Sequence, residues 1–228
     1  SKKLGLDINV LATQTDEVVA PISAFVGFEG NLISQALQWN PTHKLRLPDG
    51  SVWIDPAVGA TTINPLAQLQ YFNDKAKVTT ILASVSPSYK FTDALEYRFL
   101  YSVNRQVGTR RGQVNRNLNA QDILGRGAAF QGNQEQTNQQ ITNTLNFNKQ
   151  LTSAFNLDAV VGHEGLIFVT RGMFGAGQDF TNVGLNYYDY LGYSTQNSRG
   201  LGSFASPTTE LQSYFARAIV NYNDRYLL

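Results

Sequence analysis

The sequence predicts an all-β fold: an antiparallel transmembrane β-barrel segment of about six to seven strands with long loops on one side. Two observations predict it. Several stretches alternate between apolar and polar side chains, and the connections between these stretches are alternately long and short. Because the side chains of a strand point to its two faces in turn, each such stretch has one apolar face and one polar face.

The clearest alternation lies within residues 77–107. Apolar side chains occupy every second position from 95 to 103, and polar or charged ones such as Glu96 and Arg98 lie between them, with Leu100 as the exception. The preceding half alternates likewise, and the short FTDA turn joins both halves into an antiparallel hairpin. Such a hairpin fits a soluble sandwich, whose apolar face packs on a core, and an outer-membrane barrel, whose apolar face contacts lipid.

The rest of the chain favours the barrel. Further alternating stretches span residues 3–13, 141–151, 155–164 and 210–222, and a last strand begins near Tyr226. Long, irregular connections are expected at 16–76, 108–138 and 165–208. Every second connection of an antiparallel meander lies on the same side, so all the long loops share one side, which is typical of outer-membrane barrels.

Two local expectations follow. Asn31 can cap a short helix over Leu32–Trp39 inside the first connection. Six strands and the start of a seventh are too few to close a barrel, because bacterial barrels begin at about eight strands and open edges in lipid leave backbone groups unpaired. We therefore expect strands outside this sequence to complete the barrel.

The composition excludes several classes of function. The net charge of +1 gives no indication of nucleic acid as a partner, and the absence of cysteine excludes disulfides and cysteine-based sites. His43 and His163 lack partners at the spacing of metal ligands, and no GxSxG, HExxH or phosphate-binding loop occurs. We therefore expect no enzyme activity, no metal and no cofactor.

Several strings of the sequence are distinctive: GFEGNLISQALQWNPT (27–42), PDGS (48–51), NPLAQL (64–69), the turn YKFTDAL (89–95), FNLDAVVGHE (155–164) and SYFARAIVNYNDRYLL (213–228). In this order and spacing they resemble SusC/RagA-type TonB-dependent transporters of the outer membrane of Bacteroidota. The sequence departs from the family at His163, where an aromatic residue is commoner, and at Ala216, where glycine is usual. The resemblance covers nearly the whole chain and a middle portion of the family's barrel.

The resemblance implies a barrel of about 22 strands with a plugged lumen. Residues 1–228 would form part of the barrel domain, while the plug and the remaining strands lie outside this sequence. It also implies import of oligosaccharides or peptides across the outer membrane, energy from TonB acting through the plug, and a SusD-like lipoprotein lid. Two alternatives stay open: a SusC-like barrel that serves as a scaffold in a larger outer-membrane assembly, and a soluble β-sandwich binding module.

Two groups of side chains are candidate site residues. The first group consists of aromatic side chains in the loops, which either contact substrate or pack the loops against each other or against the lid. They are Trp39, Trp53, Tyr187, Tyr188, Tyr190 and Tyr193. Residues expected to face the lumen, as structural ion pairs rather than catalytic groups, are Glu96, Arg98, Asp158, Glu164 and Arg217. The arginines around the second connection, Arg105, Arg110, Arg111, Arg116 and Arg126, leave three partners open: anionic lipid headgroups, the lid or solvent.

Overall fold

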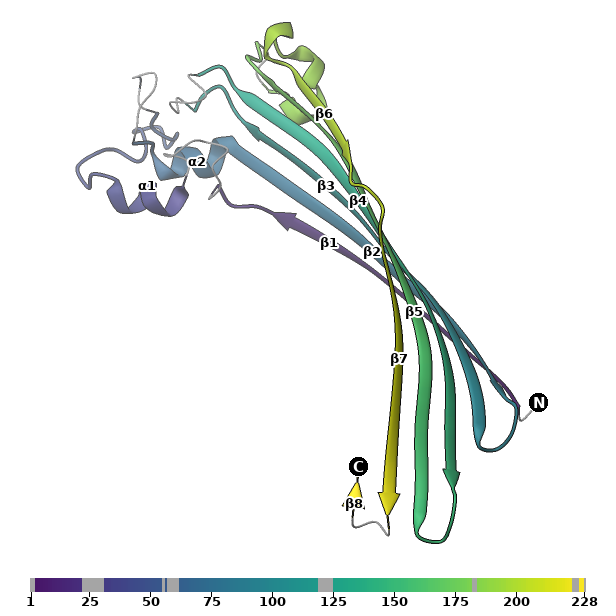
Figure 1. Ribbon diagram of the computed structural model, residues 1–228. Coiled ribbons are helices and arrows are strands. Elements are labelled where there is room, and N and C mark those ends of the chain that lie inside the picture. Colours follow the sequence, from purple (N-terminus) through teal and green to yellow (C-terminus); the bar gives the residue numbers. More distant parts are fainter. Residues whose placement is uncertain are drawn as a thin grey trace.

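A computed structural model describes residues 3–21, 31–54, 56, 62–118, 125–181, 184–222 and 226–227. They form one open, twisted antiparallel sheet (Figure 1). Its strands, in order across the sheet, are β1 (Leu4–Val18), β2 (Phe72–Lys90), β3 (Leu95–Val114), β4 (Ala128–Gln150), β5 (Phe155–Gln178), β7 (Thr209–Tyr222) and β8 (Tyr226–Leu227). The short strand β6 (Gly200–Ala205) pairs with residues 171–176, near the C-terminal end of β5.

The connections have the predicted asymmetry. Tight turns and both termini lie at one end of the sheet, and the long connections with their helices lie at the other (Figure 1). The helical elements at this loop end are α1 (Leu32–Gln38), α2 (Pro65–Tyr71) and the 3₁₀ turns η3 (Tyr187–Asp189), η4 (Leu191–Tyr193) and η5 (Gln196–Ser198). With seven residues each, α1 and α2 are too short to cross a membrane, and no other described helix is long enough.

The strands extend further toward the loop end than the alternation predicts. The Gln/Asn-rich run 131–138, expected in a loop, belongs to β4, and β5 continues to Gln178. In the extension of β4 both faces are mostly polar, and in that of β5 both faces carry apolar residues such as Leu166 and Ile167, so the period of two disappears although the backbone pairing continues. β6 was not predicted either, because its GLGSFA sequence is short and rich in glycine.

Each of the two α-helices begins directly after an asparagine whose side chain caps it. The Asn31 side chain accepts hydrogen bonds from the amides of Ile33 and Ser34, which confirms the predicted cap of α1. The second helix, α2, was missed although its signal was present. Pro65 occupies its first turn, and the Asn64 side chain accepts from the Leu66 amide.

The strand register separates two faces. Ile8, Val85 and Tyr101 are register partners on the apolar face, and one position along, Asn9, Ser84 and Ser102 are partners on the polar face. The apolar face is not covered by a second layer: on β1, Leu6 is 60% exposed and Val10 71% exposed. Side chains of this kind need an apolar environment, and in a barrel wall lipid supplies it.

Two small buried clusters lie under the loops at the loop end. The first connection packs on the polar face, where its side chains meet the strand ends in the cluster Val52, Ile63, Ala67, Phe72, Val114, Leu118 and Ala128. The third connection packs on the other face, in the cluster Ala129, Phe180, Tyr187 and Tyr188. The two loops therefore fold to opposite sides of the same strand ends.

Candidate functional site

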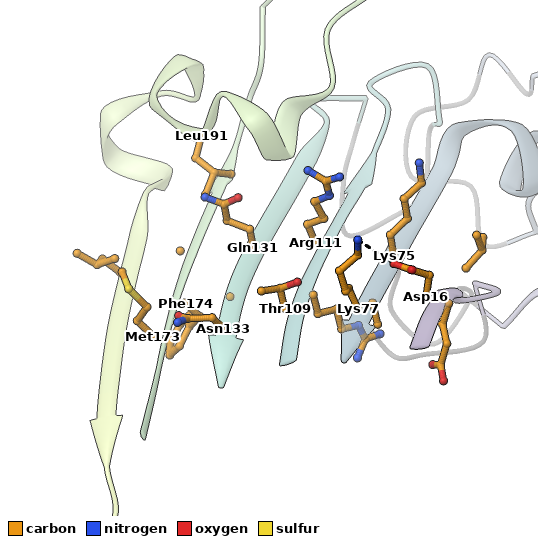
Figure 2. Close-up of a pocket in the computed structure, with 17 residues that line it drawn as sticks. Asp16, Lys75, Lys77, Thr109, Arg111, Gln131, Asn133, Met173, Phe174 and Leu191 are labelled. Carbon is orange, nitrogen blue, oxygen red and sulfur yellow. Dashed lines mark ion pairs between the residues drawn. The ribbon is translucent and has the colours of Figure 1, made fainter. Parts of the chain in front are cut away.

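A hollow of about 870 Å³ lies at the loop end of β1 to β5 (Figure 2). Three of its lining residues, Lys77, Thr109 and Asn133, form one row of register partners. Lys77 is an even number of residues from Val85 on β2, and Thr109 is an even number from Tyr101 on β3, so this row points to the same face as Val85 and Tyr101. The hollow is therefore on the apolar face, and it is not part of the polar surface described next.

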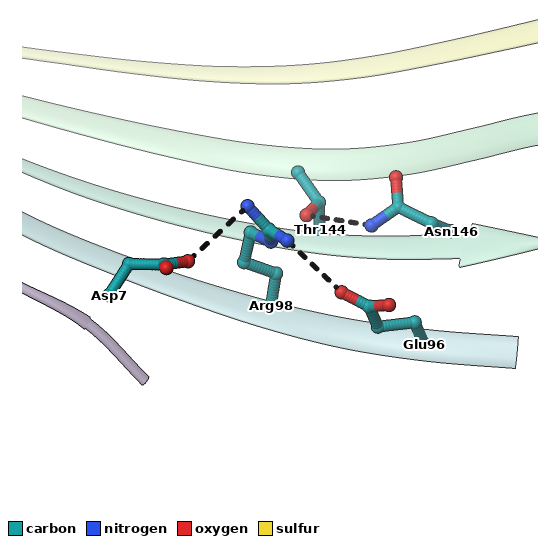
Figure 3. Close-up of polar contacts among 5 residues, drawn as sticks. All are labelled: Asp7, Glu96, Arg98, Thr144 and Asn146. Atoms are coloured by element: carbon teal, nitrogen blue, oxygen red, sulfur yellow. Dashed lines mark hydrogen bonds and ion pairs between the residues drawn. The ribbon is translucent and has the colours of Figure 1, made fainter. Parts of the chain in front are cut away.

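An ion-pair chain crosses the polar face near the turn end (Figure 3). The Arg98 guanidinium on β3 lies 3.3 Å from the Glu96 carboxylate and 3.9 Å from that of Asp7 on β1. On the neighbouring strand β4, the Asn146 amide donates to the Thr144 hydroxyl oxygen at 3.2 Å. The ion pairs join β3 to β1 across β2 and neutralise the guanidinium.

The polar face continues over β4, β5 and β7. The Gln140 amide donates to the Glu164 carboxylate at 2.8 Å, and Asn148 donates to Asp158 at 2.9 Å. Arg217 on β7 lies 3.8 Å from the Asp158 carboxylate. The five charged residues predicted to line a lumen thus share one face, and each has a polar partner there.

The charged groups of this face are accessible to water. Its ion pairs are exposed to solvent, with the Arg217 side chain 65% and that of Asp158 43% exposed. Such pairs contribute only about 0–1 kcal/mol each to stability. Among the described residues, no three metal-ligating side chains of the His, Cys, Asp or Glu type gather at one point.

The first connection brings its two tryptophans together. The rings of Trp39 and Trp53 lie 5.9 Å apart, and the His43 ring lies 5.6 Å from that of Trp39. The loop is held by buried amide side chains. Gln35 accepts a 2.7 Å hydrogen bond from the Ile63 amide, and the Asn64 amide donates to two backbone carbonyls, those of Leu45 and Trp53, both at 2.8 Å.

A solvent-exposed turn within this loop is held by an aspartate. The Ser51 hydroxyl and backbone amide both donate to the Asp49 carboxylate, at 2.6 and 2.9 Å. These hydrogen bonds favour the ionised form and lower the pKa of Asp49 below its ordinary value. The carboxylate therefore stays charged to a lower pH than an unpaired aspartate and keeps accepting the hydrogen bonds that close the turn.

Replacing Asn64 by leucine is expected to open the first connection. The change removes the α2 cap and leaves the Leu45 and Trp53 carbonyls without their donor, at a cost of about 1–3 kcal/mol per unsatisfied group. Limited proteolysis of the folded protein should then cut faster within residues 40–63. Asn40→Ala, which removes only contacts to the exposed Thr42, is the control, and equal cleavage rates for the two variants would contradict the role of Asn64.

The four tyrosines of the third connection have different environments. Tyr187 and Tyr188 are 1% and 3% exposed, and Tyr187 stacks on Phe180 with ring centroids 4.4 Å apart. In this structure they pack the loop and present no surface to a substrate or lid. Tyr190 and Tyr193 stack on each other at 5.4 Å and are 47% and 55% exposed, so they are the accessible pair.

An aromatic patch on the polar face was not predicted. The rings of Phe130, Phe174 and Phe204 lie over glycines of adjacent strands and line a hollow of about 350 Å³. A Cβ on Gly172 would lie 2.7 Å from the Phe204 ring, so only glycine leaves the room that this ring occupies. These residues lie in strand extensions that were expected as loops, and only the pairing shows that each phenylalanine faces a glycine.

No known family model matches the chain, and no curated protein matches it. Solved structures do match. The chain superposes on the RagAB peptide transporter with a TM-score of 0.77 at 14% identity, over 98% of this chain and 25% of that one. It superposes equally on the RagAB peptide importer in the open-open state (TM-score 0.77, 14% identity, 98% and 24%). For the closed-closed state the TM-score is 0.73 at 12% identity, with 98% and 25% covered.

The chain spans about a quarter of the length of these matched chains. At such low identity the likeness concerns the fold. It agrees with the open antiparallel sheet, its one-sided long loops and its exposed apolar face. The chain therefore has the all-β fold of a segment of the barrel wall of the RagAB transporter.

Proposed function

We propose that this chain is part of the wall of a SusC/RagA-type importer of the outer membrane, which takes up oligosaccharides or peptides. The observation that carries the proposal is the match of 98% of the chain to the RagAB structures. The two faces support it. One is apolar and exposed, as lipid contact requires, and the other has a hydrogen-bonded surface of polar and charged side chains suited to a watery lumen.

The loops support a partner at the surface. The first and third connections present aromatic side chains at one end of the sheet, including the half-buried Trp39 and the exposed stacked pair Tyr190 and Tyr193. Aromatic rings with polar tips anchor protein interfaces and stack on sugars and peptide groups. In the proposed importer these loops contact a SusD-like lipoprotein lid and the substrate, while TonB acts through a plug. The RagAB structures, which are of a peptide importer, favour peptides.

The experiment is gene deletion in the source organism, with growth on peptides or on glycans as sole nutrient. Deletion should abolish growth on one substrate class. The intact gene should restore it, whereas a gene without its TonB-binding segment should not. The complex extracted from outer membranes with detergent should contain a lipoprotein. Recovery as a water-soluble protein without detergent would contradict the proposal, and unchanged growth with outer-membrane localisation would indicate the scaffold role instead.

A further inference from the structure

The hollow on the apolar face lies outside any transport path. Its lining residues come from β1 to β5 and from the third connection, which supplies Leu191 (Figure 2). In the sheet, β2 to β5 are paired along both edges, so no additional strand of a closed barrel can lie beside them. In a barrel wall this hollow therefore opens to the membrane side, where lipid is the neighbour.

Its height matches the lipid headgroups. On the apolar face of β2, the apolar side chains run from Tyr89 to Ile81, and Thr79, Lys77 and Lys75 follow toward the loop end. Lys77 is four residues beyond Ile81, which is roughly 13 Å along the strand and less in height once the strand tilts. The headgroup layer begins where the hydrocarbon ends and is several ångströms thick. The backbone of both lysines therefore lies at or above the top of this layer, and their long side chains can reach down into it.

Lys75, Lys77 and Arg111 line one side of the hollow together with the carboxylates of Asp16 and Glu17, and Arg110, which also lines it, is bound to Asp74. The Lys77 ammonium lies 3.2 Å from the Asp16 carboxylate, and the Arg111 guanidinium lies 3.2 Å from Asp189. Both pairs are exposed and thus weak, so the cations can take a phosphate as an additional partner. Lys75 is exposed and forms no ion pair within the part of the chain that the structure describes.

Arg111 is also held in position. Its guanidinium carbon lies 5.1 Å from the centroid of the Tyr188 ring, a cation–π contact with a residue buried in the third connection. A fixed guanidinium binds phosphate through two parallel hydrogen bonds, which a mobile ammonium cannot do. The other side of the hollow is apolar, with Met173, Leu191 and Leu201. A cationic side next to an apolar side is complementary to an amphiphile with an anionic head.

We propose that this hollow binds the phosphate-bearing headgroup of an anionic membrane lipid. Lys75, Lys77 and Arg111 bind the phosphate, and Met173, Leu191 and Leu201 contact the apolar part that adjoins it. The inference rests on the proposed outer-membrane location. It selects lipid among the three partners that the arginines of this region leave open, because the hollow continues the apolar face that lipid covers.

The test is native mass spectrometry of the full-length protein in detergent, titrated with phosphatidylglycerol, phosphatidylethanolamine or inorganic phosphate. The wild-type protein should prefer phosphatidylglycerol. The double variant Lys75→Gln with Arg111→Gln should weaken that binding roughly 30-fold, since each cation near an anionic headgroup raises the affinity by about the same factor and two of them are removed. Lys44→Gln with Lys90→Gln removes two cations outside the hollow and should leave binding unchanged.

Three outcomes would overturn the inference: equal binding of both lipids, equal affinity of the two double variants, or displacement of lipid by millimolar inorganic phosphate. Folding of each variant is checked by the heat-dependent shift of the barrel on cold gels. If that shift is lost, the single variant Lys75→Gln, which breaks no ion pair in the described structure, carries the test with a smaller expected loss. A protein that does not fractionate with the outer membrane would refute the proposed function, whereas normal fractionation without lipid preference would refute only this inference.

Discussion

Val85→Arg is expected to destabilise the folded barrel by about 2–4 kcal/mol, the cost of an arginine at the bilayer midplane on the lipid side of a barrel. Val85 lies midway along the apolar part of β2, between Ile8 and Tyr101 in the register. Urea unfolding of the protein in lipid vesicles, followed by tryptophan fluorescence, measures the change. A long cation at this depth has no partner and must distort the bilayer to reach water.

The control differs by one position. Ser84→Arg places the same side chain on the polar face, beside Asn9 and Ser102, where it meets water and neutral polar groups. Its expected effect is below about 1 kcal/mol, like that of most surface substitutions. Equal losses for the two variants would contradict the assignment of the faces, and a larger loss at Ser84 would reverse it.

Arg110→Met is expected to destabilise the loop end of the sheet by about 3 kcal/mol. Arg110 donates to the Asp74 carboxylate through Nε and Nη2, with the shortest contact at 2.6 Å, and the Asp74 side chain is completely buried. Removing the cation leaves a buried carboxylate without its partner. This value is at the lower end of the range for the cost of breaking a buried ion pair, because the Arg110 side chain is 48% exposed.

Two further variants separate this effect from a general loss of charge. Arg105, which is on β3 like Arg110, forms an exposed ion pair with Glu135 of β4, and Arg105→Met should cost at most about 1 kcal/mol. Asp74→Leu combined with Arg110→Met removes both charges and should recover part of the stability lost in the single variant. Thermal unfolding in detergent measures all three. A loss in Arg110→Met no larger than in Arg105→Met would show that Asp74 does not depend on its partner.

The halves of the long strands nearer the tight turns could be predicted from the sequence. In the proposed barrel wall one face meets lipid and the other meets water, which accounts for the alternating polarity of residues such as Val85 and Ser84. The same alternation located Glu96, Arg98, Asp158, Glu164 and Arg217 on one face, and the loop lengths indicated on which side the long connections lie. The Asn31 cap was readable as well, because a cap involves residues only two or three positions apart.

The arrangement of side chains at the loop end could not be predicted from the sequence, because it depends on tertiary contacts. The extension of β4 is mostly polar on both faces and that of β5 carries apolar residues on both faces, so neither alternates with a period of two. Which tyrosines are buried depends on how the third connection folds onto the sheet: Tyr187 meets Phe180, while Tyr190 stays exposed. The Asp74–Arg110 pair and the cations of the hollow come together only through strand register, because contacts between distant residues depend on pairing partners that no local pattern specifies.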